Sequence, residues 1–460
     1  MTIQFNVRIF LRTGIIERLL KFSDVTTVLF WDDAKLKKEL SDLGCGVILQ
    51  ADLPKLNTLA NISRSIKNNL HHNKNIDHSS FEIEQENNFL ISQKKQEQEE
   101  NFKVKLYKRS IKILASFPFI EFFLDLLIKP SVRKNHEYKK IEQILKKNQC
   151  THMISATPYL IQEDLYLLAA KWNNIHTTAS VLSFDNIVSR NNFSIKFDNY
   201  FVWNNYNKNE LNDIYNIDFK KIEIIGPLQF DFYYSSNNLI SEKEWRDKFS
   251  IPNNRKIILF AGGYIDVVPN EQDWLEMIDN CITNGEIRDK PIILFRIHPV
   301  DPIGRWKKVL DKSKNIIFME PWNIDTTKKG HTNIQLNDIA NLCSTLNWSD
   351  VHINASSTMT VDGAIYDKPQ IGPAFDDIGN KIFDKNIKAL YQRKHFQPIT
   401  NSGGLTLATS KKELVESIND ALDVPDRLSK QRKRLVKEIC HFHDGKSADR
   451  FIKKIKSITL

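Results

Sequence analysis

Short apolar segments alternate with helical segments in two separate series along the chain, and this alternation restricts the fold more than any other feature. Strands are predicted where β-branched, aromatic and aliphatic residues cluster between turn residues. They cover residues 25–31, 46–52, 150–156, 176–183, 199–203 and 221–226, and then 256–263, 291–299, 315–320, 350–355 and 369–375. Strand–helix–strand alternation is typical of parallel sheets with helices on both faces, so the sequence predicts two doubly wound, Rossmann-like α/β domains.

The length of the chain also favours two domains, because a single hydrophobic core rarely grows beyond about 250–300 residues. The chain has 460 residues, of which 41% are hydrophobic. We predict a first domain over residues 1–234, with a polar insertion at about 57–110, and a second domain over residues 235–435. Residues 436–460 are predicted to form a closing helix that crosses back to the first domain.

The cysteines and the first residues favour a cytoplasmic protein. The five cysteines form no CxxC pair, and no histidine cluster has the spacing of a metal site, so the cysteines are interpreted as reduced core thiols. The first segment, MTIQFNVRIFLRTG, lacks the basic region, apolar region and cleavage site of a signal peptide. It is interpreted as a first strand.

The net charge of +9 comes from two basic stretches. Residues 101–150 hold twelve Lys or Arg against four Asp or Glu, and residues 427–460 hold eleven against three. The first stretch encloses the apolar segment 110–134, SIKILASFPFIEFFLDLLIKPSVRK, which is too interrupted to span a bilayer. Two interpretations stay open: a helix lying on an anionic membrane surface, or a helical hairpin buried in the first domain. Nucleic-acid binding is not expected, because the basic runs lack a recognition motif.

Polar groups follow three predicted strands of the second domain, where an open parallel sheet binds its ligands. Gly262 and Gly263 follow the strand 256–261, and such glycines allow close approach to a phosphate but are needed equally for a tight turn. Arg296 and His298 end the strand 291–297, because Pro299 cannot continue the ladder. An imidazole at this position can donate to a phosphate oxygen or act as a general acid. A histidine bonded within the core is the alternative.

The segment 349–369, SDVHINASSTMTVDGAIYDKP, changes from a buried strand to a helix at two serines. Ser357 is predicted to cap a helix over residues 358–367, whose first amides, with the hydroxyls of Ser356, Ser357 and Thr358, would form an anion site. Asp362 lies one turn inside this helix, within predicted reach of a ribose hydroxyl. The alternative is that the serines only cap the helix and Asp362 interacts with its dipole.

These motifs resemble a known family. FRIHP together with SDVHINASSTMTVDGAIYDKP is similar to the donor-side motifs of bacterial GT-B transferases of surface polysaccharides, including CDP-glycerol glycerophosphotransferase-like proteins. The segments SFDNIVSR, FDNYFVWNNYNKNEL, IIGPLQFDFY and HFHDGKSADRFIKKI extend the resemblance over roughly residues 150–460. It implies a GT-B architecture of two domains facing a cleft, with an acceptor-side first domain and a nucleotide-donor-binding second domain. By this resemblance Gly262, Gly263, Arg296, His298, Ser356, Ser357, Thr358 and Asp362 are the donor-binding residues.

The first domain lacks a clear catalytic-base motif, which an inverting transferase needs in order to accept the acceptor proton. Five acids lie near predicted strand ends: Asp32, Asp33, Glu163, Asp164 and Asp185. We expect Asp185 to be the base, because it follows the strand 176–183 directly and should face the cleft. Each of the five is also an ordinary turn or helix-start residue.

The sequence therefore predicts a metal-independent GT-B transferase that moves a sugar or polyol phosphate from a nucleotide-activated donor to a glycan or lipid-linked acceptor. His298 and Asp185 are the predicted catalytic residues. No cofactor is expected, and no DxD-like motif has the setting that would hold a metal. The expected location is cytoplasmic, with a peripheral position on the inner membrane face. Two other functions are compatible with the motifs: a nucleotide-sugar 2-epimerase-like enzyme, and a catalytically silent binding protein of the same fold.

Overall fold

The computed structural model describes residues 1–74, 106, 109–111, 113–115, 117, 120–265, 267–322, 331–375 and 381–459, without the side chains of 381–386. The chain forms two compact units. Unit 1 contains Met1–Leu228 and Ser447–Leu460, and unit 2 contains Gln229–Lys446. The change of unit thus falls a few residues before the predicted boundary at 234. The predicted domain limits stay predictions, because a compact unit need not be a domain that folds on its own.

Unit 1 contains a two-stranded and a four-stranded parallel sheet, with strand orders β1-β2 and β3-β4-β5-β6. The strands are β1 (Thr26–Leu29), β2 (Gly46–Leu49), β3 (His152–Ser155), β4 (His176–Ser180), β5 (Asn199–Val202) and β6 (Ile222–Ile224). In the second sheet each strand pairs with the next one along the chain, as consecutive strand–helix–strand connections require. The predicted strands therefore occur, although each is shorter than its apolar segment.

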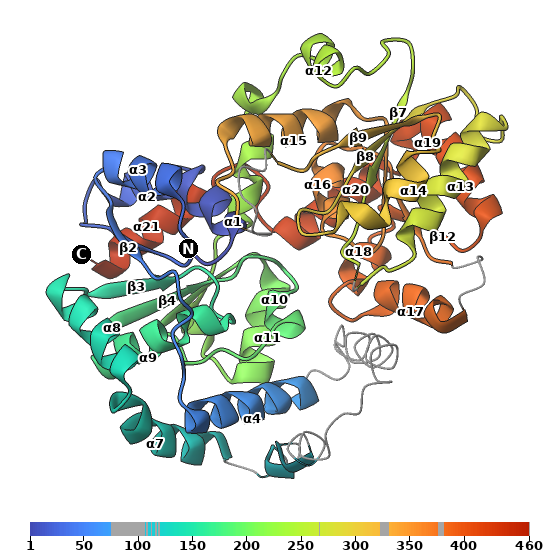
Figure 1. Ribbon diagram of the computed structural model, residues 1–460. Helices are drawn as coiled ribbons and strands as arrows, with labels where there is room; N and C mark the ends of the chain where they lie inside the picture. The colour runs from blue at the N-terminus through green and yellow to red at the C-terminus, as the bar shows by residue number, and fades with distance from the viewer. Residues whose placement is uncertain are drawn as a thin grey trace. The chain divides into compact units, whose positions relative to one another are not determined.

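The helices of unit 1 surround these sheets (Figure 1). They are α1 (Gln4–Asn6), α2 (Ile15–Leu19), α3 (Ala34–Asp42), α4 (Thr58–Lys74), α7 (Ile120–Arg133), α8 (His136–Lys147), α9 (Asp164–Trp172), α10 (Asn186–Ser189), α11 (Asn205–Tyr215) and α21 (Ser447–Thr459). The first segment of the chain is helical, with α1 followed by a π-helical turn over Val7–Leu11. The prediction of a first strand there was wrong, because the segment Val7–Leu11 is helical and is buried on all sides.

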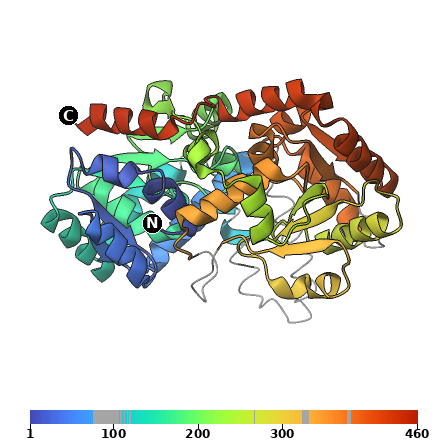
Figure 2. The ribbon, with the colours of Figure 1, turned by 90° about the horizontal axis from the view of Figure 1, so that it is seen from above.

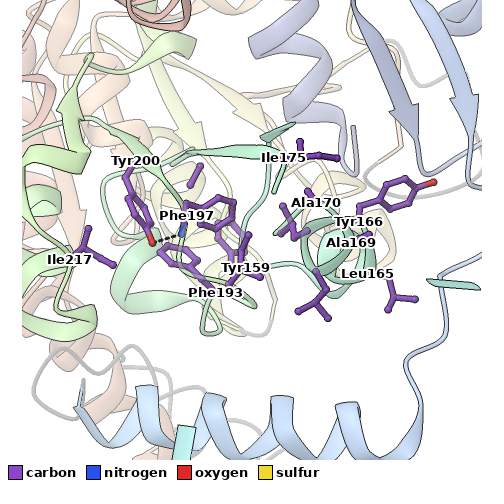
Figure 3. Close-up of a cluster of buried hydrophobic side chains, with 14 of the residues drawn as sticks. Tyr159, Leu165, Tyr166, Ala169, Ala170, Ile175, Phe193, Phe197, Tyr200 and Ile217 are labelled. Atoms are coloured by element: carbon purple, nitrogen blue, oxygen red, sulfur yellow. Dashed lines mark hydrogen bonds between the residues drawn. The ribbon is translucent and has the colours of Figure 1, made fainter. Parts of the chain in front are cut away.

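A cluster of aromatic and aliphatic side chains fills the space between the four-stranded sheet and α9 (Figure 3). Tyr200 is fully buried, and its hydroxyl accepts a hydrogen bond from the backbone N–H of Phe197 at 2.8 Å. Phe193 stacks on Tyr215 with ring centroids 4.7 Å apart. The buried phenol thus has the partner that burial requires, and its hydrogen bond joins the start of β5 to the segment that precedes the strand.

The last helix, α21, completes a second core in unit 1. Phe451 is fully buried, and its ring lies 5.9 Å from Phe10 and 5.2 Å from Phe201, both edge to face. Figures 1 and 2 both show α21 beside the first helices of the chain. The end of the chain is therefore part of unit 1, although all of unit 2 lies between α21 and the rest of that unit in sequence.

Helix α4 falls within the predicted polar insertion but is an integral part of unit 1. Ala60, Ser63, Ile66 and His71 are buried along one side of the helix. Arg64 forms an ion pair with Asp164 on α9 and donates to the carbonyl of Tyr159 at 3.0 Å. Residues 58–74 are thus not a peripheral insertion, and residues 75–105 lie outside the described part of the chain.

Unit 2 contains one six-stranded parallel sheet with the order β12-β11-β10-β7-β8-β9. Its strands are β7 (Ile257–Ala261), β8 (Ile292–Arg296), β9 (Ile316–Met319), β10 (Val351–Asn354), β11 (Gln370–Pro373) and β12 (Leu405–Ala408). The chain runs outward from β7 to β9 and then returns to place β10 on the other side of β7. The switch point of this doubly wound sheet therefore lies between β7 and β10.

Most of the helices of unit 2 lie beside this sheet (Figure 1). They are α12 (Glu242–Lys248), α13 (Glu271–Thr283), α14 (Lys307–Leu310), α15 (Leu336–Trp348), α16 (Met359–Ile365), α17 (Lys381–Gln392), α18 (Gln397–Asn401), α19 (Lys411–Asp423) and α20 (Ser429–Cys440). Helix α16 approaches the sheet closely at Gly363, where an added Cβ would collide with the side chains of His352 and Gln370. No helix among the described residues is long and apolar enough to cross a membrane.

Candidate functional site

Three loops of unit 2 begin side by side at the carboxyl edge of the sheet. In the strand register, Ala261 of β7 is the partner of Asn354 of β10 on one side and of Arg296 of β8 on the other. Gly262, His298 and Ser356, which lie one or two residues beyond these three, are partly exposed. The sheet thus brings the predicted donor-binding segments together at its switch point, where open α/β sheets bind ligands.

The glycine pair after β7 is packed tightly, and the structure shows partners for both of its amides. The N–H of Gly262 donates to the carbonyl of Arg296 at 2.9 Å, and a Cβ at Gly262 would lie 3.2 Å from the ring of Phe295. The N–H of Gly263 donates to Glu271 Oε2 at 2.6 Å. The two amides therefore fix the loop within the protein, as a tight turn requires, and close approach of a phosphate to these glycines stays a prediction.

A buried cluster of Glu271, Asp301 and Arg305 joins the loop after β7 to the loop after β8. Arg305 lies 3.3 Å from a carboxylate oxygen of each acid, and both acidic side chains are fully buried. Asp301 also accepts from the N–H of Ile265 at 2.9 Å and from Trp306 Nε1 at 2.7 Å. These bonds hold two neighbouring loops of the site in one arrangement.

The cluster has two carboxylates for one guanidinium, so it is electrostatically unbalanced when both acids are ionised. Burial raises the pKa of Glu271 to about 8, and the charge of Asp301 acts in the same direction. The hydrogen bond from Gly263 and the charge of Arg305 oppose this shift without cancelling it. The raised pKa of Glu271 favours its protonated form, which reduces the excess of negative charge in the cluster.

His298 lies at the end of β8 as a neutral, largely buried imidazole. Burial, followed by the charges of Arg296 and Arg305, lowers the pKa of His298 to about 4. Its Nδ1 accepts from the N–H of Val300 at 3.4 Å, so the proton of the neutral ring is on Nε2. In this state His298 can donate a hydrogen bond to an anionic oxygen. It becomes a general acid only if a bound anion raises its pKa.

Arg296 has a structural role that the sequence did not reveal. It is buried, its Nη2 donates to the carbonyl of Pro321 at 2.7 Å, and its guanidinium lies 4.8 Å from the ring centroid of Trp322. These contacts direct the charged group into the protein. The charge of Arg296 is one of the causes that lower the pKa of His298, and a direct contact of Arg296 with the donor stays a prediction.

The strand-to-helix turn after β10 differs in detail from the prediction. The N-cap of α16 is Thr358, without a side-chain cap bond, and the helix has only seven residues. The hydroxyl of Ser357 accepts from the N–H of Met359 at 3.2 Å, and the hydroxyl of Ser356 donates to the carbonyl of Leu390 at 3.2 Å. Ser356 has a φ of +46°, a strained conformation for a residue with a Cβ and one that clusters at ligand sites.

Asp362 does not face the partly exposed edge of the sheet. It is only 5% exposed and accepts a hydrogen bond from the hydroxyl of Tyr233. Tyr233 comes from the segment that opens unit 2, and its ring lies 5.6 Å from that of Tyr366. This buried contact ties α16 to the start of the unit, and the predicted contact of Asp362 with a ribose stays a prediction.

Asp185, the predicted base, is held by local hydrogen bonds at the start of α10. Its carboxylate accepts from Ser183 Oγ at 2.5 Å, from Ser189 Oγ at 2.7 Å and from Asn186 Nδ2 at 3.4 Å. The residue is partly exposed after the carboxyl end of β4. This arrangement is that of a helix-start carboxylate, and a role as base remains a prediction.

Three of the other candidate bases have structural partners. Asp33 caps α3 by accepting from the N–H of Leu36 at 2.9 Å. Glu163 is buried and accepts from the hydroxyl of Ser155 at 2.5 Å. Asp164 is paired with Arg64, and burial raises its pKa to about 6 against the influence of that charge. Asp32 is exposed, 3.7 Å from Lys37.

Sequence reasoning missed the cluster of Glu271, Asp301 and Arg305. A signal was present: Asp301 and Arg305 stand four residues apart directly after the His-Pro pair, and Glu271 opens the first helix after the two glycines. Acid and base at this spacing often pair across one helical turn. Among the described residues, no group of three or more His, Cys, Asp or Glu side chains could hold a metal ion.

A family comparison identifies the chain. The model of the CDP-glycerol:poly(glycerophosphate) glycerophosphotransferase family matches residues 175–457, which is more than half of the sequence. The chain belongs to this family. Family membership makes it a transferase, and the match includes the three loops at the carboxyl edge of unit 2. A search of curated proteins found no significant match.

Solved structures confirm the GT-B-like α/β fold of this glycerophosphotransferase family member. The S. aureus MnaA–UDP complex matches with a TM-score of 0.54 and 12% identity, over 100% of this chain and 95% of that chain. A Listeria monocytogenes protein described as a UDP-N-acetylglucosamine 2-epimerase matches with a TM-score of 0.55 and 13% identity, over 100% and 95%. A glycosyltransferase from Rickettsia africae matches with a TM-score of 0.50 and 15% identity, over 99% and 97%. At these identities the likeness concerns the fold alone.

Proposed function

We propose that this protein transfers a polyol phosphate or a sugar from a nucleotide-activated donor to a hydroxyl of a glycan or lipid-linked acceptor. The donor would bind at the carboxyl edge of the unit 2 sheet. The reaction would serve the synthesis of a surface polysaccharide. The observation that carries the proposal is the convergence of the loops after β7, β8 and β10 at the switch point, in a chain of a glycerophosphotransferase family. A cytidine diphosphate donor is the first candidate because the family is defined by it.

In the proposed reaction, the oxygen of the acceptor hydroxyl forms a bond to the transferred group while the bond from that group to the nucleotide phosphate breaks. The hydroxyl proton passes to a base, for which Asp185 is our candidate, and the electron pair of the broken bond leaves with the nucleotide. His298 would donate through Nε2 to a phosphate oxygen of the leaving nucleotide. A bound phosphate would raise the pKa of this histidine and so favour proton transfer to the leaving group.

Ser357 and Thr358 are the other groups proposed to contact the donor. Both are partly exposed, and both hydroxyls stand at the start of α16 on the β10 side of the switch point. We propose that these hydroxyls and the neighbouring positive charges balance the phosphates without a metal ion. Donor affinity should then be unchanged by a chelator.

Donor binding tests the site directly. Isothermal titration of CDP-glycerol, UDP-N-acetylglucosamine and the free nucleotides should reveal one preferred ligand. His298→Asn and the pair Ser357→Ala with Thr358→Ala should each weaken its binding at least tenfold, a loss of about 1.4 kcal/mol. Ser344→Ala, a fully buried serine in α15, is the matched control. Equal affinity in the folded site variants would refute the assignment.

Turnover separates transfer from the two other functions. Asp185→Asn should abolish transfer and leave donor affinity unchanged, because the base acts on the acceptor. A wild-type protein that binds a donor but neither transfers nor hydrolyses it would be a silent binding protein. Conversion of a UDP-sugar to its epimer without acceptor would indicate the epimerase.

The proposed location is cytoplasmic, with a peripheral position on the inner face of a membrane. A lipid-linked acceptor would be presented there, and the nucleotide donor is a cytoplasmic metabolite. The amount of protein that sediments with membranes after cell disruption measures this position. Its complete recovery in the supernatant would exclude it.

A further inference from the structure

The loop after β7 places an exposed aromatic ring beside His298. Tyr264 is 36% exposed. Its ring centroid lies 5.9 Å from that of His298, and the two ring planes are tilted by 42°. The two side chains follow β7 and β8, which are paired strands on one side of the switch point. A ligand bound at His298 would therefore have an aromatic side chain as its neighbour.

The backbone on both sides of Tyr264 is held by the buried acids of the cluster. The N–H of Gly263 donates to Glu271 Oε2 at 2.6 Å, and the N–H of Ile265 donates to Asp301 Oδ1 at 2.9 Å. The carbonyl of Tyr264 accepts from two later amides of the same loop, at 2.9 and 3.0 Å. These four hydrogen bonds fix the backbone of Tyr264, so its ring extends from a loop with little freedom to move.

The cluster that fixes this loop is poorly explained by stability alone. Taking charges out of water costs about as much free energy as their mutual attraction returns, so buried ion pairs add little to stability. In addition, Glu271 Oε1 and Arg305 Nε are buried without a hydrogen-bond partner in the part of the chain that the structure describes. Unpaired buried polar atoms destabilise a folded protein. The position that the cluster gives to its loop is therefore the better explanation for it.

We propose that Tyr264 packs against the polyol or sugar part of the donor, which is the part that the protein transfers. Glu271 and Asp301 are then positioning residues that act through Tyr264, because they hold the amides on either side of it. This inference rests on the proposed function, since it takes His298 as the contact of a donor phosphate.

The place of Tyr264 beside His298 favours the transferred group over the nucleotide base. In a nucleotide-activated donor the polyol or sugar is bonded directly to the phosphates, whereas the ribose separates the base from them. A polyol or sugar presents both C–H groups and hydroxyls. The tyrosine ring can pack against the C–H groups, and its hydroxyl can form a hydrogen bond with a ligand hydroxyl. A base stacked on Tyr264 is the alternative that the experiment must separate.

Titration calorimetry of the full chain with CDP-glycerol, UDP-N-acetylglucosamine, CDP and UDP tests this contact. Tyr264→Ala should weaken binding of the preferred donor by about tenfold or more, and binding of the matching free diphosphate by less than about twofold. Tyr264→Phe retains the ring and should bind the donor within about threefold of the wild type. Tyr234→Ala is the matched control, because Tyr234 is 39% exposed in the same unit.

The free diphosphate identifies the part of the donor that Tyr264 contacts. Equal losses for the donor and for its free diphosphate in Tyr264→Ala would indicate contact with the nucleotide and would overturn the proposal. Unchanged donor affinity would overturn it as well.

Substitutions of Glu271 test the positioning role. Glu271→Gln retains a side-chain oxygen for the N–H of Gly263 and should keep the donor affinity of the wild type. Glu271→Met has a similar length but no acceptor, and it should reproduce the selective loss of donor affinity seen in Tyr264→Ala. Equal losses for donor and free diphosphate in the Met variant would show a merely structural role.

The double variant Tyr264→Ala, Glu271→Met completes the cycle. It should bind the donor no more weakly than the weaker of the two single variants, because Glu271 acts through the tyrosine ring. Losses that multiply would show that the two residues act independently, which would overturn the positioning role.

Failure of this inference and failure of the proposed function give different results. A wild type that binds none of the four ligands would refute the donor site and this inference with it. A wild type that binds a donor, together with a Tyr264→Ala variant that binds it equally well, would overturn the inference alone.

Discussion

Replacement of Glu271 by Gln should remove a pH dependence from the stability of the protein. The carboxyl is fully buried, and its pKa is raised from an ordinary value of 4.5 to about 8, mainly by burial. Between these two values the folded protein keeps the proton while the unfolded chain releases it. The contribution of Glu271 to stability is therefore complete below pH 4.5 and is lost as the pH rises through 8.

The magnitude follows from the linkage between protons and folding. Within this window, the free energy of unfolding of the wild type falls by about 1.4 kcal/mol for each pH unit because of this group. Glutamine has the shape of the protonated acid and does not titrate. From pH 5.5 to 7.5 the variant should therefore gain about 2–3 kcal/mol relative to the wild type.

The assay is urea unfolding of the full chain at a series of pH values, followed by tryptophan fluorescence. Trp306, which donates to Asp301 of the cluster, is one of the eight tryptophans that contribute to this signal. Taking the difference between variant and wild type at each pH cancels the titration of other groups. Glu276→Gln, on the same helix and partly exposed, is the matched control. A difference that stays constant with pH would show that Glu271 is ionised in the folded protein, which would refute the reasoning.

Three other substitutions test packing and charge. Gly363→Ala should destabilise unit 2 by about 1–3 kcal/mol, because the new methyl group would collide with His352 and Gln370. Chemical denaturation measures this loss. An unchanged free energy of unfolding would contradict the close approach of α16 to the sheet. Arg64→Ala should lower the free energy of unfolding by about 3–5 kcal/mol at pH 8 and by clearly less at pH 5, where the unpaired Asp164 is protonated. An equal loss at both pH values would show that the carboxylate of Asp164 is not buried in charged form. Phe451→Ala should lower the free energy of unfolding by about 3–5 kcal/mol and should lower the midpoint of the first thermal transition. An unchanged midpoint would mean that α21 does not close the core of unit 1.

The sequence was sufficient to predict every strand except β12, as well as the edge of the sheet at which the candidate site lies; the extra strand predicted at the start of the chain is helical. The apolar run Ile257–Ala261 and the run Ile292–Arg296 are bounded by residues that stop a strand, so their ends were visible without a structure. Parallel pairing then placed Gly262 and His298 at one edge. The prediction relied only on local patterns and on a general rule of α/β sheets.

The orientation of individual side chains could not be predicted, because it depends on partners far away in sequence. Asp362 was assigned to the site from its position in a helix, but Tyr233 lies on the side to which it points. Arg296 was assigned from its place at a strand end, but Pro321 and Trp322 determine where its guanidinium lies. In the same way, the role of Glu271 appears only when the amide of Gly263 is seen beside it.

The position of α21 in the fold has a consequence for the synthesis of the protein. Ser447–Thr459 covers Phe10 and Phe201, yet the ribosome reaches this helix only after it has made residues 229–446, which takes about 10–40 s at ordinary translation rates. During that time unit 1 cannot close its second core, and both rings stay accessible to chaperones or to other nascent chains. The nascent protein therefore passes through a long interval in which unit 2 can fold ahead of the unit that was synthesised first.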